Sequence, residues 1–353
     1  MTNTQTAPIN VVLMNDTSSR YHHGCALVMR NLRDGLEARG STILATSYAR
    51  HDWQNDPSFI AKLRDAHLVV VNGEGTLHHG KDAGAALLKI VDRPELSDTP
   101  VALVNALYEA NPGEWGRWLS KFGICAARDS VSLAAMKADI SHATSKPDMM
   151  WLPDLSMAQG ARPVGGQRSG IIVGDSVKLN RRRDLAQLAH RLKLDQFIPT
   201  KTLRSPVWRM PVVRHLLYCA YNGVLQFRQP QFTMAADTEA YLAQLATCEG
   251  HITGRFHAVC LSMITHTPFL ALSSNASKIE RLLQDVGLGT DRLVRPDQLN
   301  SLTRADIVRP FSDQETQAID AFLERARRES DVLFDGLAEL AGGQLNLDNE
   351  EQK

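Results

Sequence analysis

The chain has 353 residues, enough for two domains with separate cores, because single domains usually run to about 100 to 200 residues. Its 39 basic and 39 acidic residues give a formal net charge of zero. Proteins that bind nucleic acid usually carry a basic surplus or stripe, so we expect no nucleic-acid partner.

Cysteine usage and hydropathy indicate a protein of the cytoplasm. The five cysteines are odd in number and lack CxxC spacing, which argues against a disulfide framework and against a zinc knuckle. They are Cys25, Cys125, Cys219, Cys248 and Cys260. The N-terminus is polar and no run of about 18 apolar residues is present, so we expect neither a signal peptide nor a membrane-spanning helix.

In the first half of the chain, short apolar runs alternate with segments whose apolar residues recur at helical spacing. Short apolar runs predict strands at residues 9–14, 42–45, 66–71, 100–105 and 123–127. Between the first two runs, apolar residues at helical spacing predict a helix from Ala26 to Gly40. This βαβ opening places His22, His23 and Gly24 in a loop at a helix N-terminus, a position suited to an anion or an acceptor.

The strand at 66–71 runs directly into a glycine-rich turn. Gly73 and Gly75 let the backbone bend sharply and approach a ligand, with Glu74 between them and His78 just beyond. Glu74 is a candidate general base for an acceptor hydroxyl, or a hydrogen-bond acceptor that orients a sugar. The alternative is a solvated loop glutamate.

Two histidine pairs, His22-His23 and His78-His79, raise the question of a metal site. Adjacent histidines point in different directions, and no acidic pair completes a recognisable metal-ligand spacing. We therefore expect no metal ion.

Two further turns of this half carry charged residues. Arg128 follows the strand at 123–127, and Asp129 is suited to cap the next helix. Arg128 is a candidate anion ligand, or else a surface arginine of a capping turn. Asp154, directly after Pro153, is either a cap or a carboxylate of the site.

A small-residue segment at 157–169 predicts a linker between two domains. The second half then contains predicted strands at 170–175 and 197–198 and predicted helices at 178–194, 209–227 and 237–248. The basic helix at 209–227 is either an ordinary packed helix or one in peripheral contact with a membrane. We expect domains at 1–160 and 161–312, followed at 313–353 by a long helix to residue 340 and a frayed acidic tail from 346.

The stretch from His251 to Leu272 carries the strongest functional signal. Gly254 allows a tight turn after a strand, and a buried helix is predicted to start near Phe256. Arg255 and His257 then lie at the helix N-terminus, where backbone N–H groups and the helix dipole favour an anion. An arginine fork binds carboxylate or phosphate, and a histidine can move a proton near neutral pH. The alternative is a capping arginine beside a histidine satisfied by the backbone.

A predicted strand at 269–272 follows, and Ser273 and Ser274 open a further helix that carries Lys278. This alternation places the candidate donor-binding residues near the carboxyl ends of neighbouring strands, where open α/β sheets bind ligands. They are Gly254, Arg255, Ser273, Ser274 and Lys278, together with Arg128.

With these motifs in view, the chain resembles the polysaccharide pyruvyl transferase family over about residues 9 to 290. The matching elements are the GEGTLH turn, the Arg128-Asp129-x-x-Ser132 turn, Pro153-Asp154, and Gly254-Arg255-x-His257 with a later helix that contains Lys278. The Arg-x-His element with its following helix is the most specific of these.

The resemblance implies an α/β fold in which two Rossmann-like domains face each other across a cleft, as in the glycosyltransferase-B architecture. It implies transfer of a pyruvyl group from phosphoenolpyruvate to a sugar of a surface polysaccharide or its precursor, with no cofactor besides this co-substrate. Arg255 and His257 would hold the phosphate and carboxylate of the donor, with His257 as the proton donor. The partners would be this small anion and a saccharide acceptor, and a lipid-linked acceptor would bring the protein to the inner face of the cell membrane.

Two departures from the family pattern leave a second function open. Arg20-Tyr21-His22-His23-Gly24 stands where the family shows Asn-x-Gly-Asp, and Gly73-Glu74-Gly75 replaces a triple glycine. An added carboxylate suits glycosyl transfer, so the alternative is a glycosyltransferase that uses a nucleotide-activated sugar, with Glu74 or Asp154 as the base. A non-catalytic protein that binds a sugar phosphate is a further alternative.

Overall fold

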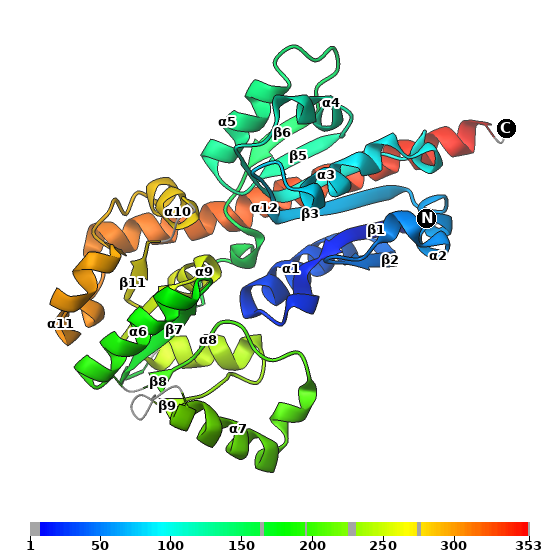
Figure 1. The fold of residues 1–353 in the computed structure, drawn as a ribbon. Helices are drawn as coiled ribbons and strands as arrows, with labels where there is room; N and C mark the ends of the chain where they lie inside the picture. The colour runs from blue at the N-terminus through cyan, green and yellow to red at the C-terminus, as the bar shows by residue number, and fades with distance from the viewer. Residues whose placement is uncertain (1–7, 163–165, 195, 225–230, 274–276, 352–353) are drawn as a thin grey trace, which may run out of the picture. The chain divides into compact units, whose positions relative to one another are not determined.

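The computed structural model describes residues 8–162, 166–194, 196–224, 231–273 and 277–351 (Figure 1). Two compact units form the chain. Unit 1 comprises Met1–Ser19, Met29–Ala158 and Ala326–Lys353, and unit 2 comprises Arg20–Val28 and Gln159–Arg325. The chain therefore changes unit within helix α1 (His23–Glu37) and within helix α12 (Asp313–Glu351), as well as near residues 19 and 158.

This division differs from the expected 1–160, 161–312 and 313–353 in two places. Residues 20–28 belong to unit 2, because the backbone N–H of His23 donates to Thr200 O at 3.0 Å and that of Thr202 donates to Tyr21 O at 2.8 Å. Helix α12 is shared between the units and continues to Glu351, beyond the expected end at residue 340. The crossing near residue 158 falls within the predicted linker at 157–169.

Unit 1 is built on a parallel sheet of six strands in the order β2-β1-β3-β4-β5-β6. The strands are β1 (Ile9–Asp16), β2 (Ser41–Tyr48), β3 (Leu68–His78), β4 (Val101–Glu109), β5 (Ile124–Ala127) and β6 (Asp148–Trp151). The order reverses between β1 and β3, so this pair forms the topological switch point, where doubly wound sheets bind ligands.

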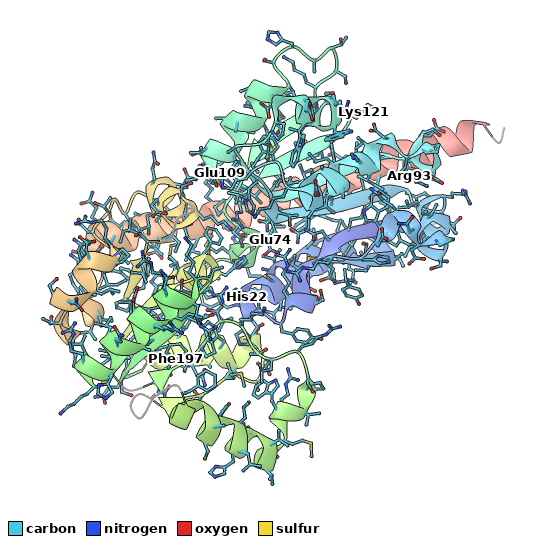
Figure 2. All side chains as sticks on the ribbon, viewed as in Figure 1. His22, Glu74, Arg93, Glu109, Lys121 and Phe197 are labelled. Atoms are coloured by element: carbon cyan, nitrogen blue, oxygen red, sulfur yellow. The ribbon has the colours of Figure 1, made fainter. Side chains whose placement is uncertain are left out.

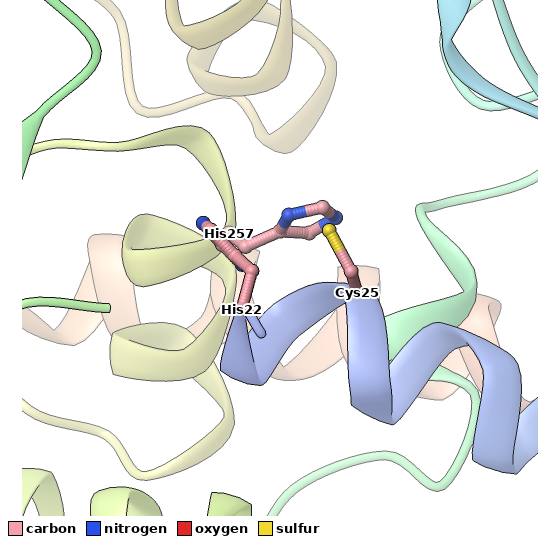
Figure 3. Close-up of side chains that lie close together, drawn as sticks. All are labelled: His22, Cys25 and His257. Atoms are coloured by element: carbon pink, nitrogen blue, oxygen red, sulfur yellow. The ribbon is translucent and has the colours of Figure 1, made fainter. Parts of the chain in front are cut away.

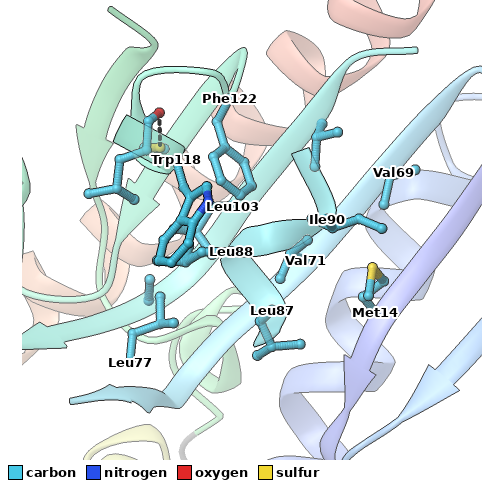
Figure 4. Close-up of a cluster of buried hydrophobic side chains, with 14 of the residues drawn as sticks. Met14, Val69, Val71, Leu77, Leu87, Leu88, Ile90, Leu103, Trp118 and Phe122 are labelled. Atoms are coloured by element: carbon cyan, nitrogen blue, oxygen red, sulfur yellow. Dashed lines mark hydrogen bonds between the residues drawn. The ribbon is translucent and has the colours of Figure 1, made fainter. Parts of the chain in front are cut away.

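The helices of unit 1 pack an apolar layer against the sheet. Besides α1 and the end of α12, they are α2 (Pro57–Leu63), α3 (Asp82–Leu88), α4 (Gly116–Leu119) and α5 (Ser130–Asp139). Val69 and Val71 of β3 and Leu103 of β4 lie in one buried cluster with Trp118 and Phe122, which come from the α4 region (Figure 4). The strands are apolar because a parallel sheet is buried on both faces.

Unit 2 has its own six-stranded parallel sheet in the order β12-β11-β10-β7-β8-β9. The strands are β7 (Ile171–Ser176), β8 (Gln196–Phe197), β9 (Gln231–Phe232), β10 (Gly250–Gly254), β11 (Phe269–Leu272) and β12 (Leu293–Val294). In chain order within the unit this is the 3-2-1-4-5-6 arrangement of dinucleotide-binding sheets, read from the other edge. Its switch point lies between β7 and β10.

The helices of unit 2 are α6 (Leu179–Leu192), α7 (Pro211–Val224), α8 (Thr238–Thr247), α9 (Phe256–Ile264), α10 (Lys278–Val286) and α11 (Arg304–Val308). Ile171, Val173 and Ile252 contribute to the core of this unit, where the ring of Phe197 (Figure 2) lies 5.9 Å from that of Phe232. The start of α9 at Phe256 is as predicted. The prediction of a loop directly after residue 71 is wrong, because β3 continues to His78. The predicted helix at 209–227 is observed as α7, and its last residues lie outside the described part of the chain.

Among the residues that the structure describes, no helix is both long enough and apolar enough to cross a membrane.

Candidate functional site

Three neighbouring strands of unit 1 are interrupted by register shifts. Asn15 of β1, Glu74 of β3 and Asn105 of β4 have φ angles of 59°, 34° and 54°. The strand pairing shifts register between Met14 and Asp16, and again directly after Glu74. Positive φ in buried residues other than glycine is costly and collects at functional sites, and bulges re-aim side chains beside them. The bulges therefore mark the switch point of unit 1 as a candidate site.

At this switch point the side-chain amides of Asn15 and Asn72 each donate to the backbone carbonyl of the other. The Nδ2 of Asn15 donates to Asn72 O at 2.6 Å and to Thr76 Oγ1 at 3.2 Å. The Nδ2 of Asn72 donates back to Asn15 O at 3.3 Å, and Asn72 is fully buried. Asn105 is also fully buried, and its Oδ1 accepts from Leu155 N at 3.1 Å. Buried amides with partners stabilise one backbone geometry, so this network holds the bulges in place.

Glu74 (Figure 2) is part of this buried network rather than of a solvated loop. Its side chain is 3% exposed, and the hydroxyl of Thr17 donates a short hydrogen bond to its Oε2. The alternative of a solvated loop glutamate is therefore wrong. Gly73 beside it allows close packing, because a Cβ there would lie 2.5 Å from the Cβ of Ala106. Gly75 and His78 are partly exposed residues of the same strand.

Arg128 and Asp154 form a buried ion pair in unit 1. Arg128 Nη1 lies 3.6 Å from Asp154 Oδ2, and both side chains are almost fully buried. Asp154 also accepts from Ser156 N at 3.0 Å and so caps a short 3-10 helix (Leu155–Met157), which is one of the two roles expected for it. Asp129 caps α5 as predicted, through a bond from Ser132 N at 2.7 Å. Arg128 is therefore a buried residue that pairs with a carboxylate, and it is not a surface arginine.

In unit 2, Arg255 and Asp175 meet at the switch point between β10 and β7. Arg255 is the N-cap of α9, and its Nε and Nη2 donate to Asp175 Oδ2 at 2.9 Å and 2.5 Å. The Oδ1 of the same carboxylate accepts from Thr200 N at 3.0 Å. Asp175 therefore orients the guanidinium. Gly254 allows the end of β10 to lie close to Ser176 of β7, because a Cβ at position 254 would lie 2.7 Å from Ser176 Oγ.

The start of α1 lies against the start of α9 within unit 2. A Cβ on Gly24 would lie 2.2 Å from the Cβ of His257, so only glycine allows this approach. The rings of His22 and His257 meet edge to face with centroids 5.2 Å apart. Figure 3 shows that the side chains of His22, Cys25 and His257 lie close together. The two N-terminal turns that the sequence placed at comparable positions are therefore brought together.

Burial lowers the pKa values of His22 and His23 at the start of α1. Desolvation, followed by the charges of His257 and Arg255, lowers the pKa of His22 well below its ordinary value. Burial also lowers the pKa of His23 to about 4, although the carboxylate of Asp237 opposes this shift. The ring of His23 stacks on that of Tyr241 with centroids 4.8 Å apart, which fixes its orientation.

The remaining predicted donor-binding residues follow β11. Ser273 is partly buried, and its backbone N–H donates to Val294 O at 2.9 Å. Lys278 is the first residue of α10 and is partly buried. Ser274 lies outside the described residues.

Sequence reasoning missed the residues that organise both switch points. Asp175 was the last residue of a predicted strand, and a carboxylate at that position is itself a signal of a site. Asn15 and Asn72 also followed predicted strands, but asparagine is equally common in ordinary turns. Thr200 and Tyr241 carried no distinguishing signal.

Comparison with solved structures shows the fold. A UDP-bound structure of MnaA from S. aureus superposes with a TM-score of 0.53 at 11% identity, covering 89% of this chain and 91% of that one. A UDP-GlcNAc 2-epimerase from Neisseria meningitidis, bound to UDP-GlcNAc, gives a TM-score of 0.52 at 13% identity, covering 94% of this chain and all of that one. These likenesses confirm the expectation of two Rossmann-like domains.

Comparison with curated proteins gave no match. A family model described as polysaccharide pyruvyl transferase matches residues 22–275. The matched range begins at His22 and includes Glu74, Arg128, Asp154 and the Arg255-x-His257 element. The chain belongs to the polysaccharide pyruvyl transferase family.

Proposed function

We propose that this protein transfers a pyruvyl group from phosphoenolpyruvate to two hydroxyls of one sugar, in a surface polysaccharide or its precursor. One observation carries the proposal: the N-termini of α1 and α9 meet in unit 2, with Gly24 against His257 and Arg255 beside them. Membership of the family supports the reaction class. We place the reaction in the cytoplasm, where the donor is produced.

Phosphoenolpyruvate carries a phosphate and a carboxylate on a three-carbon frame, so its site needs several donors of positive character close together. Each helix N-terminus offers backbone N–H groups and the positive end of its dipole. The guanidinium of Arg255 is held by Asp175 through Nε and Nη2, which fixes its plane. We assign the donor to this region of unit 2, with Ser273 and Lys278 as further ligands.

The chemistry requires one proton at the methylene carbon of the donor. His257 is buried with 6% exposure, and we assign it this proton transfer. Protonation of the methylene carbon makes the adjacent carbon electrophilic, and one sugar hydroxyl adds there with loss of its proton. A second hydroxyl of the same sugar then displaces the phosphate, which leaves with the remaining proton, and the product is a pyruvyl ketal.

The acceptor hydroxyl needs a base, and we assign this role to Glu74 of unit 1. Its carboxylate is held by Thr17 on a bulged strand, which fixes its direction. Asp154 is the weaker candidate, because it already caps a helix and pairs with Arg128.

The test offers the purified protein phosphoenolpyruvate or a nucleotide sugar together with a panel of sugars. We expect phosphate release only with phosphoenolpyruvate, and a product whose new methyl group acquires one deuterium when the reaction runs in D₂O. Release of a nucleoside diphosphate instead would establish the glycosyltransferase alternative, which the UDP-bound structural neighbours make the natural competitor. Binding of either donor without turnover across the panel would favour a sugar-phosphate-binding protein.

A further inference from the structure

Two histidines and a cysteine converge in unit 2 at the point where α1 and α9 begin. One ligand atom from each of His22, Cys25 and His257 lies within 4.8 Å of the other two. The three side chains are 9%, 4% and 6% exposed (Figure 3). The Nδ1 of His22 is buried and makes no hydrogen bond to the residues that the structure describes.

The backbone explains why these three residues meet. His22 directly precedes α1 and Cys25 lies in its first turn, and residues three apart share one face of a helix. His257 lies in the first turn of α9, and Gly24 lets the two helices approach because it has no Cβ to clash with His257. The cluster is therefore built into both helix starts rather than into a loop.

We infer that His22, Cys25 and His257 form a site for one thiophilic divalent cation of the Zn²⁺ class. A sulfur and two imidazole nitrogens are the donor set that Zn²⁺ prefers over Mg²⁺ or Ca²⁺, with a fourth position left for water or an anion. In a tetrahedral zinc site the ligand atoms lie roughly 3.5 Å apart, so the cluster would close by about 1 Å, which side-chain rotation supplies. Binding displaces the thiol proton of Cys25 to solvent.

Occupancy by the cation inhibits transfer, a consequence that rests on the function proposed above. A nitrogen of His257 that coordinates the cation cannot carry a proton to the donor. The two imidazoles and the thiolate also lie where the two helix starts would receive an anion. Turnover should therefore survive removal of metal by chelation and fall when Zn²⁺ is added.

The binding test uses Co²⁺ as a spectroscopic substitute for Zn²⁺ on the full-length protein. We expect one equivalent to bind, with a thiolate-to-cobalt charge-transfer band in the near ultraviolet that Zn²⁺ abolishes. Cys25→Ala should remove the band and weaken binding by more than about 100-fold, beyond the range for loss of an outer ligand.

The matched control is Cys219→Ser, because Cys219 is exposed and its Sγ lies 3.6 Å from His215 Nε2. The band should persist in this variant. A band that survives Cys25→Ala but disappears in Cys219→Ser would overturn the assignment, as would the absence of a band in the parent protein. Circular dichroism and the thermal midpoint establish that each variant is folded.

Inhibition is measured separately with phosphoenolpyruvate as the donor. Added Zn²⁺ should lower turnover of the parent and of Cys219→Ser, whereas Cys25→Ala should require at least about 100-fold more Zn²⁺ for the same inhibition. Cobalt binding through Cys25 without any effect of Zn²⁺ on turnover would overturn the inhibitory role. A protein that turns over no phosphoenolpyruvate refutes the proposed function, and the cobalt spectrum still decides whether the site exists.

Discussion

The two units use the same kind of sheet edge in opposite ways. At the switch point of unit 1, neutral amides of Asn15 and Asn72 hold the bulged strands, and a hydroxyl holds the carboxylate of Glu74. At the switch point of unit 2, a guanidinium and a carboxylate meet, Arg255 on Asp175. Under the proposed function, the first arrangement positions a base for the acceptor, and the second orients a guanidinium for the anionic donor.

A second difference lies in what each switch point receives from elsewhere in the chain. Unit 1 builds its network from strands β1 and β3 of its own sheet, with the 3-10 turn (Thr17–Arg20) that follows β1. Unit 2 also takes in residues 20–28, a segment that follows β1 and that is hydrogen-bonded to residues 200–202 of unit 2. The segment after β1 therefore contributes His22 and His23 to the region of unit 2 where we propose that the donor binds. The predictions below separate the two roles.

The largest effect should follow from His257→Gln, which removes the proposed proton donor of unit 2. We expect turnover to fall by about 10²- to 10⁴-fold, the usual contribution of a positioned acid or base. Binding of phosphoenolpyruvate, measured by calorimetry, should be partly kept because Arg255 remains. The matched control is His190→Gln, an exposed histidine of α6 in the same unit. A parental rate in His257→Gln would assign His257 a structural role.

Glu74→Gln tests whether Glu74 of unit 1 is the base for the acceptor hydroxyl. The change keeps the size and the hydrogen bond from Thr17 but removes the proton acceptor, so we expect turnover to fall by about 10²-fold or more. Donor affinity should stay within about threefold, a change of roughly 0.7 kcal/mol or less. Thr17→Val, which leaves the carboxylate but removes its hydroxyl donor, should have a smaller effect on turnover. A loss of donor affinity with an intact rate would instead show that Glu74 touches the donor.

Local patterns in the sequence were enough to predict most of the strands, though not β6, β9 or β12, as well as the start of α9 at Phe256 and the positions of Arg255 and His257 at its N-terminus. These features depend on residues close together in the chain. The pairing of Arg255 with Asp175 joins residues 80 positions apart, and the approach of His257 to Gly24 joins positions still further apart. No periodicity encodes such contacts. The expectation of no metal site rested on the histidine pairs and on the lack of an acidic partner; Cys25, which we infer to be a ligand, belongs to a different pattern.

Arg255→Ala should weaken donor binding and also lower stability, since Asp175 would remain buried without its guanidinium. Removal of one partner from a buried pair costs roughly 3 to 5 kcal/mol, and we expect the lower end because Arg255 is 16% exposed. The double variant Arg255→Ala/Asp175→Asn should recover most of the unfolding free energy without recovering donor affinity. If the double variant recovered both the unfolding free energy and the donor affinity, Arg255 would have only a structural role.

Asn15→Ala should destabilise unit 1 while leaving donor binding in unit 2 unchanged. It removes two donated hydrogen bonds and places alanine at φ 59°, so we expect a loss of about 2 to 3 kcal/mol in urea unfolding. Asn15→Gly loses the same bonds without the backbone strain and should be about 1 kcal/mol more stable than Asn15→Ala. Equal stability of the two variants would show that the positive φ is not maintained in solution.

A pH dependence should also distinguish unit 2 from unit 1. His251 is fully buried, its Nδ1 lies 2.8 Å from Ser262 Oγ, and burial lowers its pKa from 6.5 to about 3. Between these values the unfolded chain binds a proton that the folded chain does not. The stabilising contribution is therefore complete above pH 6.5 and is lost as the pH falls toward 3, at about 1.4 kcal/mol per pH unit.

Hydrogen exchange of the β10 amides at pH values from 7 to 4.5 follows this loss within unit 2. The variant His251→Asn stays neutral at every pH and can keep the contact with Ser262, so its stability should fall by about 1 kcal/mol less per pH unit than that of the parent. His190→Asn, which changes an exposed histidine of the same unit, should keep the parental slope. Identical slopes in the parent and His251→Asn would mean that the acid sensitivity of unit 2 comes from His22 and His23, whose pKa values burial also lowers. In that case the acid-sensitive element would be the segment at residues 20–28 rather than the sheet itself.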